Sequence, residues 1–209
     1  MHPAMLLAML GGLAVVWALA AVGQACAQWS GTAPFATIFR FVFGLAALAC
    51  GVAALMLAAT LRVYQVFTAE TLVARVRCEA PGPGSRFRLQ YTPVGGLAET
   101  YDLAGDQWAI DGEIVKWHPR LVLLGFKTVH KPTRIGGRFS NIYRETAQPP
   151  TAFELNGGLD PAWQTLYRLR SYVPGVEAVY GSSAYTFVEP GVEELVYVTT
   201  SGYLVKPKP

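Results

Sequence analysis

The chain has 209 residues, of which 52% are hydrophobic and only 15% are charged. Soluble domains usually carry about 25% charged residues. The deficit lies in residues 1–61, where Arg40 is the single Lys, Arg, Asp or Glu, whereas the rest has the charge density of an ordinary globular protein. Composition therefore excludes a soluble domain over the whole length. It predicts an apolar part, 1–67, followed by one globular domain, 68–209.

Two stretches, 5–25 and 41–61, contain no Asp, Glu, His, Lys or Arg. A helix rises about 1.5 Å per residue, so each stretch spans about 30 Å, which matches the hydrocarbon thickness of a bilayer. Arg40 and Arg62 bracket the second stretch, and aromatic residues flank it as they often do at membrane interfaces. The pattern predicts two transmembrane helices that form a hairpin.

A cleaved signal peptide is the alternative interpretation of the first stretch, because residues 25–27 (Ala-Cys-Ala) resemble a small-residue cleavage site. Residues 1–3 contain no Lys or Arg, however, and the stretch is longer than a typical signal core of roughly 7–15 residues. We favour a retained helix. Arg62, Arg75 and Arg77 follow the second helix, so the positive-inside rule predicts a multi-pass protein with a cytoplasmic C-terminal domain under either interpretation.

Each stretch carries small residues at alternating spacings of three and four, which lie on one helix face. They are Gly11, Ala14, Ala18, Ala21 and Ala25 in the first stretch and Gly44, Ala47, Gly51, Ala54 and Ala58 in the second. Such faces let helices approach closely in lipid. They predict a packed hairpin, a contact with a second copy or a contact with another membrane protein, unless the Ala- and Gly-rich composition produces them by chance. Transport by this chain alone is not expected, because transport pathways normally use ionisable groups.

The soluble part alternates with the two-residue period of half-buried strands. Its apolar positions are Leu72, Ala74, Val76 and Cys78, which alternate with Val73, Arg75, Arg77 and Glu79, and then Phe87, Leu89 and Tyr91. Further strands are predicted at 101–103, 185–188, 194–200 and 203–205. The dipeptide Asp111-Gly112 predicts a two-residue hairpin turn within 108–117. The apolar run 121–126 predicts a buried strand that continues to His130.

One helix is predicted from Asp160 as N-cap and Pro161 in the first turn, with Trp163 on its apolar face. A short helical turn is expected at 140–145, and the Pro pair at 149–150 breaks the chain. The predicted fold class is therefore membrane-anchored α+β, with a mostly antiparallel sandwich or barrel-like domain and one long helix.

No pattern predicts a catalytic, metal or cofactor site. His118 and His130 do not have the spacing of helical metal ligands, and no acidic residue lies between them. Residues 181–184 (Gly-Ser-Ser-Ala) are not a nucleophile elbow, which needs Gly on both sides of Ser. The three cysteines, Cys26, Cys50 and Cys78, are too widely spaced for a disulfide framework.

Basic residues are concentrated in one block of the domain. Between 114 and 144 there are no acids, and the bases are Lys116, Arg120, Lys127, Lys131, Arg134, Arg138 and Arg144. One interpretation is a set of solvated strand faces balanced by the acids in 89–113. The other is a surface for anionic ligands, of which the headgroups of a nearby bilayer are the first candidates. Nucleic acid is less favoured, because no recognised reader module is present.

Three segments, 112–126, 137–145 and 176–185, resemble a family of proteobacterial inner-membrane proteins of uncharacterised function. Members have two N-terminal helices and one C-terminal domain, and some carry the label cation or multidrug efflux pump. The resemblance implies a bacterial inner-membrane location and no particular catalytic residue. Our leading hypothesis is a non-enzymatic accessory or interaction protein with a cytoplasmic β-rich domain. The alternatives are a component of an efflux system and a membrane-bound enzyme.

Overall fold

The structure is a computed structural model that describes residues 3–27, 34–148 and 150–209. Residues 28–33, which lie between the two predicted helices, and Pro149, the first proline of the predicted chain break, lie outside the described residues. The chain divides into two compact units, 1–66 and 67–209.

The first unit consists of helices α1 (Pro3–Ala27) and α2 (Pro34–Phe67). Both are long and apolar enough to cross a membrane. Helix α2 has 34 residues, so it extends beyond the predicted span 41–61 at both ends and measures about 51 Å.

The small-residue stripes lie where α1 and α2 pack on each other. Gly11, Gly44 and Gly51 are buried, as are Ala18, Ala25 and Ala58. Ala14, Ala21, Ala47 and Ala54 are half-buried. A Cβ added at Gly51 would lie 2.8 Å from Cγ2 of Val15 and 3.1 Å from the carbonyl oxygen of Gly11. The stripes therefore contact each other within one chain.

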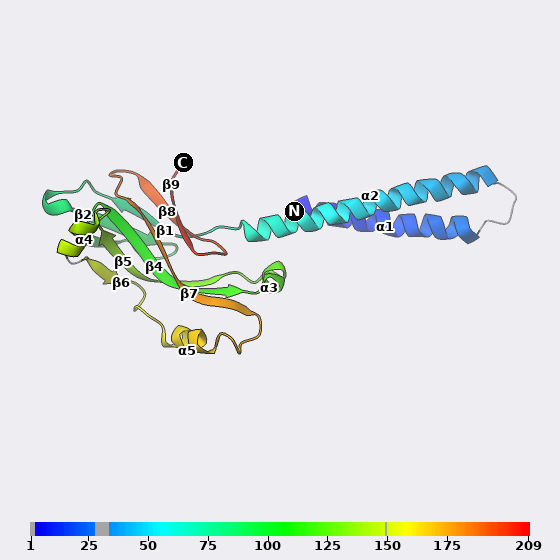
Figure 1. Ribbon diagram of the computed structural model, residues 1–209. Helices are drawn as coiled ribbons and strands as arrows, with labels where there is room; N and C mark the ends of the chain where they lie inside the picture. Colours follow the sequence, from blue (N-terminus) through cyan, green and yellow to red (C-terminus); the bar gives the residue numbers. More distant parts are fainter. Residues whose placement is uncertain (1–2, 28–33, 149) are drawn as a thin grey trace. The chain divides into compact units, whose positions relative to one another are not determined.

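The second unit is a sandwich of two antiparallel sheets (Figure 1). Sheet A has the order β3-β2-β1-β8-β9, and sheet B has the order β6-β5-β4-β7. The strands of sheet A are β1 (Thr71–Cys78), β2 (Arg86–Pro93), β3 (Glu99–Ala104), β8 (Glu193–Val198) and β9 (Tyr203–Pro207). Those of sheet B are β4 (Gln107–Trp117), β5 (Val129–Arg138), β6 (Ala152–Glu154) and β7 (Val176–Phe187).

Apolar side chains from both sheets fill the space between them. Sheet B contributes Trp108, Ile110 and Ile114 of β4 and Ile135 of β5. Sheet A contributes Val76, Leu89, Leu103, Val196 and their neighbours. The domain thus has a hydrophobic core of its own.

Short helices connect the strands: η1 (Pro83–Ser85), α3 (Pro119–Leu123), α4 (Ile142–Ala147) and α5 (Pro161–Leu169). Figure 1 shows α3 and α4 at opposite ends of sheet B, and α5 on the side of sheet B that faces away from sheet A. Helix α5 begins where Asp160 and Pro161 predict, but it has only nine residues, so the predicted long helix is short. The turn predicted at 140–145 is α4, two residues further on.

We call the end of the sandwich where β1 begins the proximal end. In sheet A, the β2–β3 turn (94–98) and the β8–β9 turn (199–202) lie there, because the N–H of Val94 donates to the carbonyl of Val73 and Thr71 pairs with Val198. In sheet B, α3 and the start of β5 lie there, next to the start of β9. Helix α4 lies at the opposite, distal end.

The prediction of a hairpin turn at Asp111-Gly112 is wrong, because β4 runs without interruption through both residues. The dipeptide forms a β-bulge against β5. Gly112 faces the other sheet, where an added Cβ would lie 2.5 Å from the backbone oxygen of Lys131 and 2.5 Å from the hydroxyl of Tyr203. Glycine is needed here for the close approach of sheet A and not for a turn.

Two further expectations are wrong for local reasons. Residues 121–126 are not a buried strand: Pro119 begins α3, His118 caps it, and the following Leu124 and Phe126 are exposed. Val73 is buried instead of outward-facing, because the β1–β8 register shifts between Leu72 and Ala74. The alternation predicted for Phe87, Leu89 and Tyr91 is confirmed, since all three are buried.

Replacing Gly51 by Leu tests the packing of α1 on α2. The Leu side chain would force the helices apart, so we expect Gly51→Leu to lower the free energy of unfolding by about 1–3 kcal/mol. Gly12→Leu is the matched control, because no atom lies within 4 Å of a Cβ at that position. Unfolding in mild detergent with increasing dodecyl sulfate measures both variants, and equal stabilities would contradict this packing.

Gly112→Ala tests the contact between the sheets. The added methyl group meets backbone as well as side chain, so we expect a loss of about 1–3 kcal/mol in the free energy of unfolding by urea. Gly181 lies on β7 beside Glu113 of β4, and a Cβ there meets nothing within 4 Å. Gly181→Ala should therefore remain within about 0.5 kcal/mol of the natural chain. A loss of the same size in both variants would count against the close approach of Tyr203.

Candidate functional site

Small residues line part of the outer face of sheet B, which is the face turned away from sheet A. They are Ala109 of β4, Gly136 of β5, and Gly181 and Ser183 of β7. We call this hollow the sheet B groove. It contains a pocket of about 460 Å³ beside α5 and one of about 340 Å³ beside α4. Both pockets have Asp111, Arg134 and Ser183 in their walls, so they lie next to each other along the strands.

An ion pair lies at the centre of the groove. Asp111 and Arg134 are cross-strand neighbours on β4 and β5, and Oδ2 of Asp111 accepts from Nε of Arg134 at 2.7 Å and from Nη2 at 2.6 Å. The arginine side chain is largely exposed, so the pair contributes only about 0–1 kcal/mol to stability. It presents a carboxylate and a guanidinium to any ligand that crosses from one pocket to the other.

Helix α5 and the loop before it form one wall of the groove. The side chain of Asp160 caps α5 by accepting from the N–H of Ala162 at 2.8 Å. The backbone N–H of Asp160 donates to Oε1 of Glu113 at 3.0 Å. Glu113 points to the outer side of β4 but is buried. This hydrogen bond fastens the loop to the sheet, so the wall is held in place by a buried carboxyl group.

Trp163, on α5, is part of that wall and lines the larger of the two pockets. Its ring stacks on Tyr167 with 5.3 Å between centroids. Its Nε1 is buried and has no hydrogen-bond partner among the described residues. A buried donor without an acceptor costs about 1–3 kcal/mol. An acceptor oxygen that reaches Nε1 would remove that cost, and Trp163 is one of the residues that line the larger pocket.

Three of the seven basic residues predicted to contact anions are paired with acids. Lys116 contacts Glu177 at 2.8 Å, Lys131 contacts Asp160 at 3.7 Å, and Arg134 pairs with Asp111. Antiparallel pairing causes this, because it places acids from the neighbouring strands or loops beside the basic block. These three bases are therefore partly neutralised.

The other four basic residues lie at the two ends of sheet B. At the distal end, the guanidinium of Arg138 lies 4.5 Å from the ring centre of Tyr185, and that of Arg144 lies 4.6 Å from the ring centre of Phe139. Arg120 of α3 and Lys127 of the following loop are exposed at the proximal end. The seven bases are thus spread along the whole length of sheet B.

The histidines are held by local contacts. Nδ1 of His118 accepts from the backbone N–H of Arg120 at 3.3 Å. The ring of His130 lies edge-on to Tyr203, and burial lowers the pKa of His130. The hydroxyl of Ser182 accepts from the backbone N–H of Tyr203 at 3.0 Å. Within residues 3–27, 34–148 and 150–209, no group of three or more His, Cys, Asp or Glu could hold a metal ion.

A polar cluster lies inside the sandwich. Nε1 of Trp108 donates to Oε2 of Glu194 at 2.7 Å, and both residues are buried. Burial raises the pKa of Glu194. Burial, followed by the charge of Glu194, raises the pKa of the Cys78 thiol to about 12. Cys78 is therefore a protonated, poorly reactive thiol that packs as part of the core.

No protein-family model, curated protein or solved structure matches the chain.

The sheet B groove was not predicted from the sequence. The available signal was the row of small residues at outward positions of β4, β5 and β7, which is visible only once the register of these strands is known.

The buried carboxyl of Glu194 predicts a pH-dependent stability difference. Because its pKa is raised on folding, ionisation destabilises the folded state as pH rises above the ordinary value of 4.5. Glu194→Gln can still accept from Trp108 but does not ionise. We expect the free energy of unfolding of the variant, minus that of the natural chain, to increase as pH rises from about 4.5 and then to level off above the folded-state pKa. Urea titrations across this range measure the difference, and a constant difference would contradict a raised pKa.

Proposed function

We propose that this chain is a non-enzymatic, membrane-anchored interaction protein whose β-sandwich domain binds a segment of another membrane protein in the sheet B groove. The observation that carries the proposal is the groove itself, with its floor of small residues and the unpaired Nε1 of Trp163 in its wall. Small floor residues allow a bound backbone to approach the sheet closely.

The shape and chemistry of the groove favour an extended polypeptide over a compact metabolite. Its two pockets follow one another along the strands, so successive outward side chains of an extended segment could occupy them. Asp111 and Arg134 at the centre offer complementary charges for polar or charged groups of that segment. A backbone carbonyl of the segment would accept the hydrogen bond from Trp163.

The anchor in this proposal is the helix pair. Helices α1 and α2 are apolar along the lengths that a bilayer requires, and their small residues pack them together. The arginines that follow the second apolar stretch favour a cytoplasmic domain at the bacterial inner membrane. In that arrangement the partner would be a membrane protein with a cytoplasmic segment.

A role in an efflux system is a narrower form of this proposal, in which the partner is an efflux component. It rests on the family resemblance of segments 112–126, 137–145 and 176–185. The enzymatic alternative lacks a comparable observation, because the polar groups of His130 and Ser182 are both engaged by Tyr203.

Site-specific photocrosslinking in cells tests the groove. A photoreactive amino acid at Ser183 should give a discrete adduct with one membrane protein, and the same residue at Gln90, on the outer face of sheet A, should not. Gly181→Leu adds a side chain to the groove at a position where a Cβ meets no atom within 4 Å. An unchanged free energy of unfolding would show that the fold is retained. We expect this variant to reduce the Ser183 adduct at least about tenfold, which corresponds to about 1.4 kcal/mol of binding free energy.

The control for the groove-filling variant is Gln90→Leu, which adds an apolar side chain to the opposite sheet. The adduct should keep its yield in this variant. An adduct that persists in Gly181→Leu, or one that forms equally from Gln90, would exclude the groove as the binding surface. A fusion of a cytoplasm-active reporter to the C-terminus checks the orientation, and its inactivity would contradict a cytoplasmic domain.

A further inference from the structure

The proximal end of the domain carries exposed apolar side chains on loops of both sheets. Val94 and Leu97 lie in the β2–β3 turn of sheet A, and Leu97 is 87% exposed. Leu124 and Phe126 follow α3 of sheet B, and Leu124 is 76% exposed. Turns are usually polar, so apolar tips at the same end of two separate sheets indicate a surface that meets an apolar phase. We call these four residues the proximal rim.

Basic side chains accompany the rim. Arg120 and Lys127 flank Leu124 and are exposed, and no acidic side chain is within ion-pair distance of either among the described residues. Two of the nearby acids are engaged: Glu177 pairs with Lys116 at 2.8 Å, and Glu70 pairs with Lys206 at 2.6 Å. Glu99, which follows the β2–β3 turn, is exposed and accepts a hydrogen bond from the Tyr101 hydroxyl. The positive charge without an acidic partner therefore lies on the α3 side of the rim, beside Leu124 and Phe126, which is the combination that anionic lipid surfaces bind.

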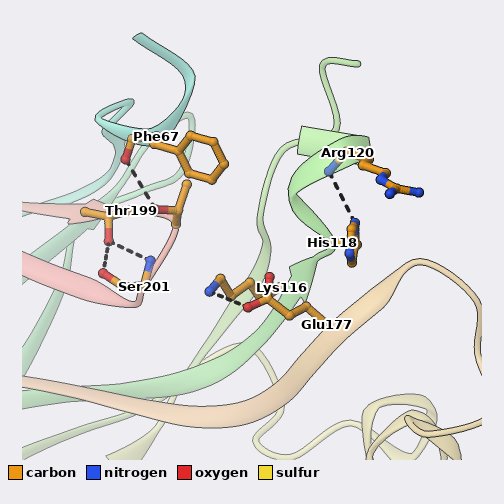
Figure 2. Close-up of polar contacts among 8 residues, drawn as sticks. Phe67, Lys116, His118, Arg120, Glu177, Thr199 and Ser201 are labelled. Carbon is orange, nitrogen blue, oxygen red and sulfur yellow. Dashed lines mark hydrogen bonds and ion pairs between the residues drawn. The ribbon is translucent and has the colours of Figure 1, made fainter. Parts of the chain in front are cut away.

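The proximal end of the domain is the end that the chain enters directly after α2. Only three residues separate Phe67, the end of α2, from Thr71, the start of β1. An extended backbone covers at most about 3.6 Å per residue, so this connection reaches about 14 Å at most. The carbonyl of Phe67 accepts from the hydroxyl of Thr200 in the β8–β9 turn at 3.3 Å. Figure 2 shows Phe67 together with that turn and with His118 and Arg120 of the α3 region.

We propose that the proximal rim docks on the anionic surface of the bilayer that anchors the chain. Leu124, Phe126, Val94 and Leu97 enter the interface between headgroups and acyl chains, and Arg120 and Lys127 contact lipid phosphates. This inference rests on the membrane anchor of the proposed function.

The distal end provides an internal comparison. Helix α4 also exposes apolar residues beside an arginine, with Tyr143 83% exposed next to Arg144. It lies at the opposite end of sheet B from α3 (Figure 1). If exposed apolar and basic residues alone were enough to bind lipid, both ends of the domain would bind it. If the connection to α2 decides which end meets the bilayer, only the proximal rim would bind it.

The test measures the lipid contact of single positions in the full chain. Cys26 and Cys50 are replaced by Ser, Cys78 stays buried, and one new cysteine is introduced as Leu124→Cys or as Tyr143→Cys. An environment-sensitive fluorophore is attached, and each protein is reconstituted into vesicles of phosphatidylcholine and phosphatidylglycerol. Quenching by nitroxide-labelled lipid and by aqueous iodide is then compared.

We expect the probe at position 124 to be quenched several-fold more by the nitroxide lipid, and several-fold less by iodide, than the probe at position 143. Arg120→Glu combined with Lys127→Glu should remove most of this difference, as should vesicles of phosphatidylcholine alone. Retention of the lipid quenching without phosphatidylglycerol would overturn the assignment to anionic lipid. Equal iodide quenching at both positions would overturn the docking of the rim.

Alkaline carbonate extraction of the same vesicles separates this inference from the anchor. If the protein stays in the membrane while position 124 remains open to iodide, the anchor stands and the rim proposal fails. If carbonate releases the protein, the anchor and the rim proposal fail together. Protection of position 124 from iodide without lipid quenching in native membranes would assign the rim to a protein partner and also overturn the proposal.

Discussion

The close approach of Tyr203 to Gly112 is the contact on which the sandwich and its outer groove depend. Gly112 lies in the middle of β4, an inner strand of sheet B, where any Cβ would overlap the hydroxyl of Tyr203. Since glycine leaves this space open, Tyr203 packs between the sheets and contacts His130 and Ser182. The β-bulge at the same place keeps Asp111 on the outer face opposite Arg134. The close approach in the core and the bulge beside the polar centre of the groove therefore occur at neighbouring residues of β4.

Local pairing sets the surface charge of the domain. The acidic block at 89–113 and the basic block at 114–144 are adjacent in the sequence, and the antiparallel β4–β5 pairing brings members such as Asp111 and Arg134 together. Surface pairs of this kind add little stability, but they neutralise much of sheet B's outer face. Four bases of this block have no acid within ion-pair distance among the described residues: Arg120 and Lys127 at the proximal end, and Arg138 and Arg144 at the distal end. Of these, Arg120 and Lys127 lie at the end of the domain where the connection from α2 enters.

The two proposed surfaces complement each other because they use different parts of the domain. The rim consists of loop tips at the proximal end, whereas the groove follows the strands of sheet B. A domain held at its rim keeps the groove free for a neighbouring protein. The buried pair of Trp108 and Glu194 lies between the sheets and belongs to neither surface, so its role is in the core.

The sequence by itself determined the two-part organisation, the apolar helices, the strand alternation of 86–91 and the start of α5 at Pro161, because each follows from local composition or from a capping residue. Tertiary structure decided the rest. Asp111-Gly112 has the local chemistry of a turn, yet β4 continues through it because β5 and β7 pair with it on both sides. Residues 121–126 are apolar enough for a strand, yet Pro119 and His118 begin a helix there. The groove joins Asp111, Arg134, Trp163 and Ser183 from four separate elements, and only the register of β4, β5 and β7 brings them together.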